Sequence, residues 1–329
     1  MNKEKIAVIG GAGFIGSRLA SRFDKKKSDY VIYDINSVSR NDTKYLDVEA
    51  PSSLEQLKGS NSIVNLAAVH RDDVRPLSRY DDVNVQGAVN LCNAARKQNI
   101  SKILFTSSVA IYGFASENTD ESGDPNYFND YGRTKFEAEF IYKAWQEEDP
   151  DNRTLVIIRP TVVFGEGNRG NVFNLLKQIA SKRFIMFGTG KNRKSMAYVE
   201  NVAAFIEYGL SFKAGIHIFN YIDKPDLDMN TLVSNTRKIL FGTENVGIRL
   251  PAVLGIAIGY IFDLFSYFTK ISLPVSSIRV KKFMKTTQFS SSVKKTGFVA
   301  PISLEEGLSQ TVIYEFLEDN TGQRTFDTE

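Results

Sequence analysis

Short, continuous apolar runs alternate with longer segments of helical periodicity along the first half of the chain. Residues 6–9 are four apolar residues in a row, and comparable runs occur at 62–68, 102–108 and 156–158. Runs of this length are typical of strands buried on both faces of a parallel sheet. Between them, residues 80–98 carry apolar side chains at helical spacing. The pattern predicts an α/β fold built on a doubly wound parallel sheet.

The chain is predicted to divide near residue 165. We expect residues 1–165 to form the sheet domain, with further sheet contributions from about 195–220, because 197–202 has the pattern of a strand that returns to the sheet. Residues 166–329 would mainly form a smaller C-terminal lobe. A chain of 329 residues is long enough for both parts.

One apolar stretch departs from this alternation. Between Leu250 and Thr269 only Asp263 carries a charge, and a membrane-spanning helix needs about 20 apolar residues. Pro251 and the central Asp263 argue against a span. We therefore expect two packed helices of the C-terminal lobe and no transmembrane segment, with peripheral contact at a membrane surface as the alternative.

Composition narrows the class of protein. A net charge of +3 and a charged fraction of 24% are those of an ordinary globular protein and give no basis for nucleic-acid binding. Cys92 is the only cysteine, so no intramolecular disulfide can form, which favours a cytoplasmic location, and we expect it in the core. One cysteine and two histidines exclude a conventional zinc site, and we expect no metal. A strand so close to the N-terminus predicts no signal peptide.

Three glycines follow the first apolar run, and each has a physical use if a dinucleotide binds there. Gly10 would make the tight strand-to-helix turn, Gly13 would let the backbone approach a pyrophosphate, and Gly16 would let the helix pack on the sheet. The N-terminus of that helix then presents free N–H groups and a positive dipole end to the phosphates. This is the pattern of a Rossmann dinucleotide site.

An acidic residue stands about twenty residues further on, where this kind of site requires one. Asp34 closes an apolar strand at 29–34. Its carboxylate can accept hydrogen bonds from both ribose hydroxyls of the adenosine, and it would repel a 2′-phosphate. The sequence therefore favours NAD over NADP, although Arg40 is near enough in sequence to help bind a phosphate.

Further candidates lie at the ends of the next two strands. Asp47 and Val48 end a strand predicted over 43–48; Asp47 can bond the adenine amino group while Val48 packs on the ring, or Asp47 can cap a following helix. Ala67 and Ala68 are small where the chain must pass close to a cofactor. His70 follows at the carboxyl edge of the sheet, where ligands bind.

Tyr131 and Lys135 open a helix that we expect to run to about Glu148. The spacing of four places them on one helical face, one turn apart. An ammonium beside a phenol lowers the pKa of the phenol, which suits a base near neutral pH. The hydroxyl of Ser108, at the end of the preceding strand, can reach the same substrate oxygen. A surface pair of Tyr and Lys is also common in helices, so the spacing by itself leaves both interpretations open.

Taken in order along the chain, these motifs resemble a known family. They are the glycine motif, Asp34, Asp47-Val48, Asn65-Leu66-Ala67-Ala68, Ser108 before Tyr112-Gly113, Tyr131 with Lys135, Arg159-Pro160, Tyr198 to Val202, and Ser303 to Leu308. The chain resembles the extended short-chain dehydrogenases/reductases and, within them, the NAD-dependent nucleotide-sugar epimerase/dehydratase family. The resemblance runs from about Lys5 to Phe316.

The resemblance implies a role for each of these positions. NAD would be bound by Gly10, Gly13, Phe14, Ile15, Gly16, Asp34, Asp47, Val48, Leu66, Ala67, Ala68, Tyr131 and Lys135. Tyr131 would take the proton of a sugar hydroxyl while the adjacent carbon gives hydride to NAD; Lys135 would bias it toward phenolate, and Ser108 would stabilise developing charge on the same oxygen.

The substrate, a nucleotide-diphosphate sugar, would be held by residues of both parts. The candidates are His70, Ser108, Asn171, Lys194 and Arg279. Lys194 occupies the place of a basic phosphate contact in the family. Its neighbour Arg193 is a rival for that role, and Lys281 and Lys282 lie close to Arg279. Each of these cations could equally be a solvated surface charge.

One departure from the family constrains the reaction. Dehydratases of the family carry an Asp-Glu pair directly after the active-site hydroxyl residue, where this chain has Val109 and Ala110. Neither side chain can move a proton, which argues against a 4,6-dehydratase.

We therefore expect a C4 epimerase of a UDP-hexose or UDP-N-acetylhexosamine, acting as a homodimer through the helices that carry Asn84 and Tyr131. The first alternative is an NAD(P)H-dependent nucleotide-4-keto-sugar reductase of surface-polysaccharide synthesis. The second is a non-catalytic NAD-binding protein, which would have no use for an activated phenol.

Overall fold

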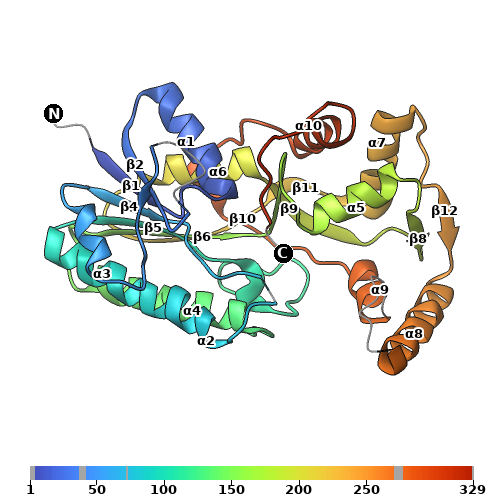
Figure 1. Ribbon diagram of the computed structural model, residues 1–329, viewed down its shortest axis with the longest axis horizontal. Helices are drawn as coiled ribbons and strands as arrows, with labels where there is room; N and C mark the ends of the chain where they lie inside the picture. The colour runs from blue at the N-terminus through green and yellow to red at the C-terminus, as the bar shows by residue number, and fades with distance from the viewer. Residues whose placement is uncertain (1–3, 37–41, 72, 270–276, 328–329) are drawn as a thin grey trace.

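The computed structural model describes residues 4–36, 42–71, 73–269 and 277–327. Its centre is a seven-stranded parallel sheet in the order β10-β6-β5-β4-β1-β2-β3 (Figure 1). The strands are β1 (Lys5–Ile9), β2 (Asp29–Asp34), β3 (Lys44–Tyr45), β4 (Ser62–Asn65), β5 (Lys102–Thr106), β6 (Thr154–Pro160) and β10 (Gly215–Tyr221). The order reverses between β1 and β4, so the predicted doubly wound sheet is confirmed, and its ligand crevice lies at the carboxyl ends of these two strands.

Helices cover both faces of this sheet. Helices α1 (Phe14–Lys26) and α6 (Val199–Gly209) pack together on one face, and α3 (Gly87–Gln98) and α4 (Asp130–Glu147) cover the other (Figure 1). Strand β1 divides its side chains between the two: Ala7 and Ile9 join the core under α3 and α4, whereas Ile6 and Val8 join the core under α1 and α6. This alternation explains why a buried parallel strand is apolar at every position.

The expected continuous helix over 80–98 is instead built from three pieces. A short α2 (Ser78–Tyr80) leads into a π-helical turn, η3 (Asp81–Gln86), and then into α3. The strand predicted over 43–48 is reduced to β3, because the chain turns away from β2 after Tyr45. Both changes lie beside the crevice, and a π-helical turn is often associated with a functional site.

The C-terminal lobe has its own small sheets and core. One sheet has the order β11-β9-β7, from β7 (Val162–Phe164), β9 (Arg193–Tyr198) and β11 (Asp223–Asp228), and the other pairs β12 (Ile248–Leu250) with β8 (Ile185–Phe187). Helices α5 (Asn171–Ala180), α7 (Met229–Phe241) and α10 (Leu304–Phe316) pack around a shared apolar core.

The expectation that 197–202 returns to the central sheet is wrong. Residues up to Tyr198 belong to β9 in the lobe, and α6 begins at Val199. The main-chain N–H of Tyr198 donates to the carboxylate of Asp223 at 2.7 Å, which fixes the end of β9 against β11 instead. The later strand β10 is the one that joins the central sheet, beside β6.

The apolar stretch forms one helix, not the two that we expected. Helix α8 (Ala252–Thr269) begins directly after Pro251 and packs against α9 (Ser277–Met284). Gly255 lies within α8, where its missing side chain leaves room for the Phe187 ring. A Cβ there would lie 2.5 Å from Cδ1 of Phe187. Among the helices of the described residues, none is long and apolar enough to cross a membrane.

Candidate functional site

The glycine-rich turn between β1 and α1 is shaped by close backbone packing. Gly10 has a φ of +71°, and a Cβ there would lie 2.6 Å from the main-chain nitrogen of Ala67. A Cβ at Gly16 would lie 2.5 Å from Cα of Gly11, so the helix can approach the turn only with glycine at this position. At Gly13 a Cβ would meet only the carbonyl oxygen of Gly10, at 3.2 Å. Gly13 therefore leaves its outer side open to a ligand, next to the N–H groups of Phe14 and Ile15 in the first turn of α1.

Asp34 ends β2 beside this turn. Its carboxylate accepts hydrogen bonds from the main-chain N–H of Ala12 at 3.1 Å and of Asn36 at 3.0 Å. A carboxylate has about four acceptor sites, so it can still bind two ribose hydroxyls. These two hydrogen bonds fix the side chain beside the glycine-rich turn, and the turn and Asp34 together fit NAD.

Replacing this carboxylate tests the cofactor preference. We expect Asp34→Ala to weaken NAD binding at least 10- to 100-fold, because the loss of even one hydrogen bond to a charged group costs about 1.5–3 kcal/mol. NADP should be affected less, because the repulsion of its 2′-phosphate is removed. Isothermal titration with both dinucleotides measures the change. Asp29→Ala, an exposed aspartate at the other end of β2, is the matched control, and an unchanged ratio of the two affinities would contradict the assignment.

The adenine end of the crevice has a preformed wall. Asp47 accepts from the N–H of Glu49 at 2.9 Å, within a local turn, so its carboxylate caps no helix. Val48 is buried against Gly87, where a Cβ would lie 2.9 Å from the Val48 side chain. Leu66, Ala67 and Ala68 continue from β4 as a partly buried segment. These positions lie around the crevice as expected, and their contacts to NAD remain a prediction.

Ser108 and Tyr131 come together at the carboxyl end of β5. Ser108 begins the 3-10 turn η4 (Val109–Tyr112), where its hydroxyl accepts from the N–H of Ala110 at 3.1 Å. It also lies close enough to the Tyr131 phenol to lower the pKa of that group. Tyr131 stands in the first turn of α4, which Asn129 caps by accepting from the N–H of Gly132 at 2.9 Å.

Lys135 lies one turn after Tyr131 and is buried. Its ammonium is 4.5 Å from the centre of the Phe105 ring. Burial lowers the pKa of Lys135 to about 7, although the charge of Glu139 opposes the shift. The expected acidification of Tyr131 by this lysine is not what the structure shows: burial raises the pKa of Tyr131, and the Ser108 hydroxyl opposes the rise.

A buried ion pair, which the sequence analysis did not identify, fixes the frame of these residues. Both carboxylate oxygens of Glu139, on α4, accept from the Arg159 guanidinium of β6, at 2.8 and 2.6 Å. Glu139 also accepts from Ser107 at 2.6 Å, and Arg159 donates to the Tyr112 hydroxyl at 2.6 Å. Breaking such a pair leaves an uncompensated buried charge, so it locks α4 to β5 and β6. The available signal was Arg159 alone, the one charged residue in the apolar run of β6.

Asn84 has a similar positioning role. From the π-helical turn it donates to the carbonyl of Val69 at 2.9 Å and accepts from the N–H of Val69 at 2.8 Å. It also donates to the Thr134 hydroxyl of α4 at 3.0 Å. The loop after β4, which carries His70, is thereby tied to the helix of Tyr131 and Lys135.

The predicted substrate residues are not equally placed. The pKa of His70 is lowered by desolvation and, more weakly, by the charge of Lys135, so this ring lies near Lys135. Lys194 donates to the carbonyl of Lys285 at 2.6 Å, and Asn171 is exposed at the start of α5. The side chain of Arg279, like all of Arg40, lies outside the described residues.

Two further expectations concern cysteine and metals. Cys92 is buried in the core under α3 and α4, as predicted, and burial raises the pKa of its thiol to about 12. Such a thiol stays protonated and inert.

In the parts of the chain that the structure describes, no group of three or more His, Cys, Asp or Glu side chains could hold a metal ion.

Comparisons with known proteins agree with this geometry. A family model described as the NAD dependent epimerase/dehydratase family matches residues 6–220. The chain is 45% identical, over 99% of both proteins, to the N-acetyl-alpha-D-glucosaminyl-diphospho-ditrans,octacis-undecaprenol 4-epimerase of Escherichia coli O157:H7. It is 27% identical to the UDP-glucose 4-epimerase of Vibrio cholerae, over 96% of this chain and 97% of the relative.

Solved structures show the same fold. The UDP-N-acetylglucosamine 4-epimerase of Bacillus cereus superposes with a TM-score of 0.75 at 17% identity, covering 96% of this chain and 98% of that one. The UDP-glucose 4-epimerase of Thermotoga maritima gives 0.74 at 21% identity, covering 95% and 100%.

Proposed function

The chain belongs to the NAD-dependent epimerase/dehydratase family, and we propose that it epimerises C4 of an N-acetylhexosamine joined through a diphosphate to a polyprenyl lipid. An exposed aromatic surface beside the basic residues of the substrate crevice carries this proposal. A nucleotide carrier is the alternative that the experiment below distinguishes.

The side chains at the crevice support a redox-neutral cycle. In its phenolate form Tyr131 accepts the proton of the C4 hydroxyl, and Ser108 donates a hydrogen bond to the same oxygen. NAD, when bound, takes the hydride from C4 and returns it. The 4-keto sugar turns over between these two steps, so that hydride returns to its opposite face, and Tyr131 gives the proton back. Lys135 stands one helical turn after Tyr131 on α4.

Other reactions of the family are less well supported. Val109 and Ala110 form the turn directly after Ser108 and cannot exchange protons, which argues against loss of water. A 4-keto-sugar reductase would use the same three side chains, but both relatives compared above are 4-epimerases.

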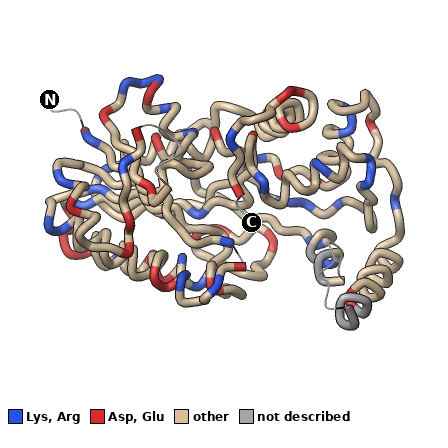
Figure 2. The backbone as a smooth tube through the Cα atoms, viewed as in Figure 1, with Lys and Arg blue, Asp and Glu red and all other residues tan. Residues whose placement is uncertain are grey.

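The basic side of the crevice supports a diphosphate-linked substrate. Lys194, on β9, contacts the segment after α9 through Lys285 and Thr287. Burial and the charge of Lys285 lower the pKa of Lys194 to about 8, so two ammonium groups lie close together. Two neighbouring cations of this kind suit a diphosphate. Figure 2 shows basic residues at the start of β9, which are Arg193 and Lys194.

An apolar surface adjoins these cations. The Lys285 ammonium lies 5.0 Å from the centre of the Phe114 ring, and Phe114 stacks on Phe128 with ring centres 5.1 Å apart. The two rings are 58% and 52% exposed. Phe128 stands three residues before Tyr131, so an apolar surface extends from the catalytic helix to the cations. A nucleotide gains little from such a surface, whereas a polyprenyl chain leaving the diphosphate can bury it.

Helix α8 offers a second apolar surface at the outer end of the lobe (Figure 1). Val253 and Ile261 are 75% and 65% exposed, and Lys281 of α9 donates to the Tyr260 hydroxyl at 2.8 Å. An apolar helix face bordered by lysines suits the headgroup region of a membrane that holds the lipid. The relative that is 45% identical acts, by its name, on a diphospho-undecaprenol substrate, which agrees with this placement.

The carrier can be tested directly. Purified protein would receive either N-acetylglucosaminyl-diphospho-undecaprenol in detergent or UDP-N-acetylglucosamine, with the released sugar analysed by NMR. We expect kcat/KM to be at least 100-fold higher for the lipid-linked substrate. Replacing Phe114 and Phe128 together by serine should lower kcat/KM for the lipid substrate about tenfold and leave UDP-sugar turnover unchanged, while exposed Val299→Ser serves as control. Preferred conversion of the UDP-sugar would overturn the lipid assignment.

Three further expectations from the sequence are part of the proposal: a dimer, the division of the chain into two parts, and the location in the cell. Helices α3 and α4 lie side by side on one face of the sheet, where we place the contact between two copies of the chain. The division near residue 165 and a cytoplasmic location complete this description.

A further inference from the structure

The segment after α10 folds back over the glycine-rich turn. We call residues 320–327 the strap. Its Phe326 donates a main-chain hydrogen bond to the carbonyl of Gly167 at 2.8 Å and accepts one from the N–H of Arg169 at 2.9 Å. Asn168 and Phe326 therefore form a parallel bridge between the strap and the loop that joins β7 to α5.

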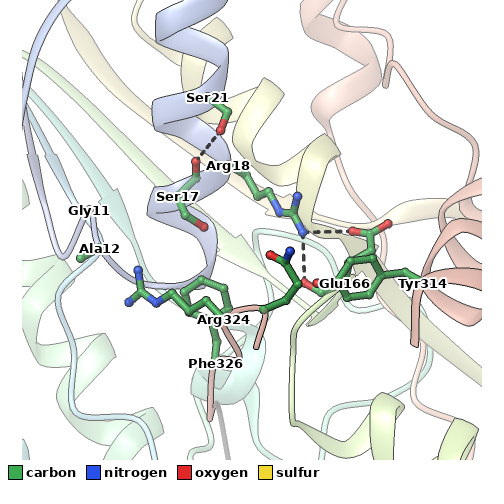
Figure 3. Close-up of a pocket in the computed structure, with 10 residues that line it drawn as sticks. Gly11, Ala12, Ser17, Arg18, Ser21, Glu166, Tyr314, Arg324 and Phe326 are labelled. Atoms are coloured by element: carbon green, nitrogen blue, oxygen red, sulfur yellow. Dashed lines mark hydrogen bonds and ion pairs between the residues drawn. The ribbon is translucent and has the colours of Figure 1, made fainter. Parts of the chain in front are cut away.

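The loop that receives the strap is itself held firmly. Glu315 of α10 accepts from the N–H of Gly167 at 2.7 Å and from the Arg169 guanidinium at 2.9 Å. Glu166 accepts from Arg18 of α1, as Figure 3 shows, and from the Tyr198 hydroxyl at 2.6 Å. The strap thus lies on a fixed frame made by α1, α10 and β9.

Two side chains of the strap face the glycine-rich turn. The Phe326 ring packs against Phe14, with ring centres 5.6 Å apart. The Arg324 guanidinium lies 4.5 Å from the centre of the Phe326 ring, and the side chain extends toward Gly11 and Ala12 (Figure 3). Burial lowers the pKa of Arg324, and the charge of Asp34 opposes this effect. A guanidinium, which stays charged even so, therefore lies beside the turn and the ribose carboxylate.

The far end of the strap reaches the opposite side of the crevice. The main chain of Asp327 lies close to the His70 ring, in the loop after β4. The strap therefore runs from the β7–α5 loop, past the glycine-rich turn, to the loop after β4. Between the strap and α1 lies an open pocket of about 300 Å³, whose walls include Ser17, Arg18 and Arg324.

We propose that the strap is a wall of the dinucleotide site, which holds NAD in place between turnovers, with Arg324 supplying positive charge to the diphosphate. An epimerase takes and returns the same hydride, so it gains nothing from releasing its cofactor after each cycle. A segment that crosses the crevice and brings a guanidinium to the glycine-rich turn slows that release. The glycine-rich turn alone provides only N–H groups and a helix dipole.

The rate of NAD release tests this assignment without measuring turnover. The full-length protein is loaded with radiolabelled NAD, chased with excess unlabelled NAD and sampled by rapid filtration. We expect Arg324→Ala and Phe326→Ala each to release NAD at least tenfold faster, and Arg324→Lys, which keeps the charge, to lie between Arg324→Ala and the wild type. Lys294→Ala, which removes an exposed charge on η5 (Val293–Thr296), should change the rate less than twofold.

Two results would overturn the proposal. Release rates equal to the wild type in both alanine variants would show that the strap does not contact the cofactor. Faster association and tighter binding of NAD in these variants would show that the strap competes with it. Circular dichroism and the melting temperature of each variant confirm that the fold is kept, so a changed rate is assigned to the strap.

Discussion

Tyr131→Phe is expected to lower kcat by about 10²- to 10⁴-fold, the range that a positioned general base contributes. The variant keeps the ring and its packing at the start of α4 and loses only the hydroxyl that Ser108 contacts. No other phenol hydrogen-bonds Ser108 in the described part of the chain, so no second base replaces it. NAD content should stay at the wild-type level, because the glycine-rich turn and Asp34 are untouched.

The measurement combines turnover with bound cofactor. Product formation from the sugar substrate would be followed by NMR, and NAD would be released by heat and quantified. Tyr127→Phe, an exposed phenol four residues earlier, is the control and should retain full kcat. If Tyr131→Phe kept more than a tenth of the wild-type kcat, another group would have to accept the proton.

Lys135→Met is expected to stabilise the fold while it removes activity. The pKa of Lys135 falls from its ordinary 10.5 to about 7 because the ammonium is buried. The unfolded chain therefore binds this proton more tightly than the folded protein does. The resulting cost to folding is fully present below about pH 7 and disappears as the pH rises toward 10.5. A methionine of similar length avoids it, so the free energy of unfolding should increase by roughly 3–5 kcal/mol at neutral pH.

Urea unfolding of the protein stripped of NAD, at pH 7 and pH 10, measures this difference. The stabilisation should be largest at pH 7 and should shrink at pH 10, while kcat falls at least 100-fold at both. Lys97→Met, an exposed lysine on α3, controls for loss of a charge. A variant that is less stable than the wild type at pH 7 would show that the lysine is paired and not merely desolvated.

Local patterns in the sequence determined much of the architecture. Strands β1, β4, β5 and β6 were predictable because burial on both faces demands an unbroken apolar run, which is visible without knowing the neighbours. Short motifs were predictable because the spacing of each has one physical reason. These motifs are the glycine-rich turn, Asp34 at its distance from that turn, and the pair Tyr131 and Lys135.

Only the tertiary structure decided features that depend on contacts between distant residues. Glu139 pairs with Arg159, and Phe326 of the strap pairs with Asn168. No periodicity in the sequence relates the segments that these pairs join. The same holds for β9, which pairs in the lobe although its apolar pattern equally suits the central sheet. The pKa of Tyr131 rises because burial by the surrounding fold outweighs the effect of the Ser108 hydroxyl. Spacing along a helix fixes which side chains are neighbours, whereas solvent exclusion and partner choice depend on the whole packed molecule.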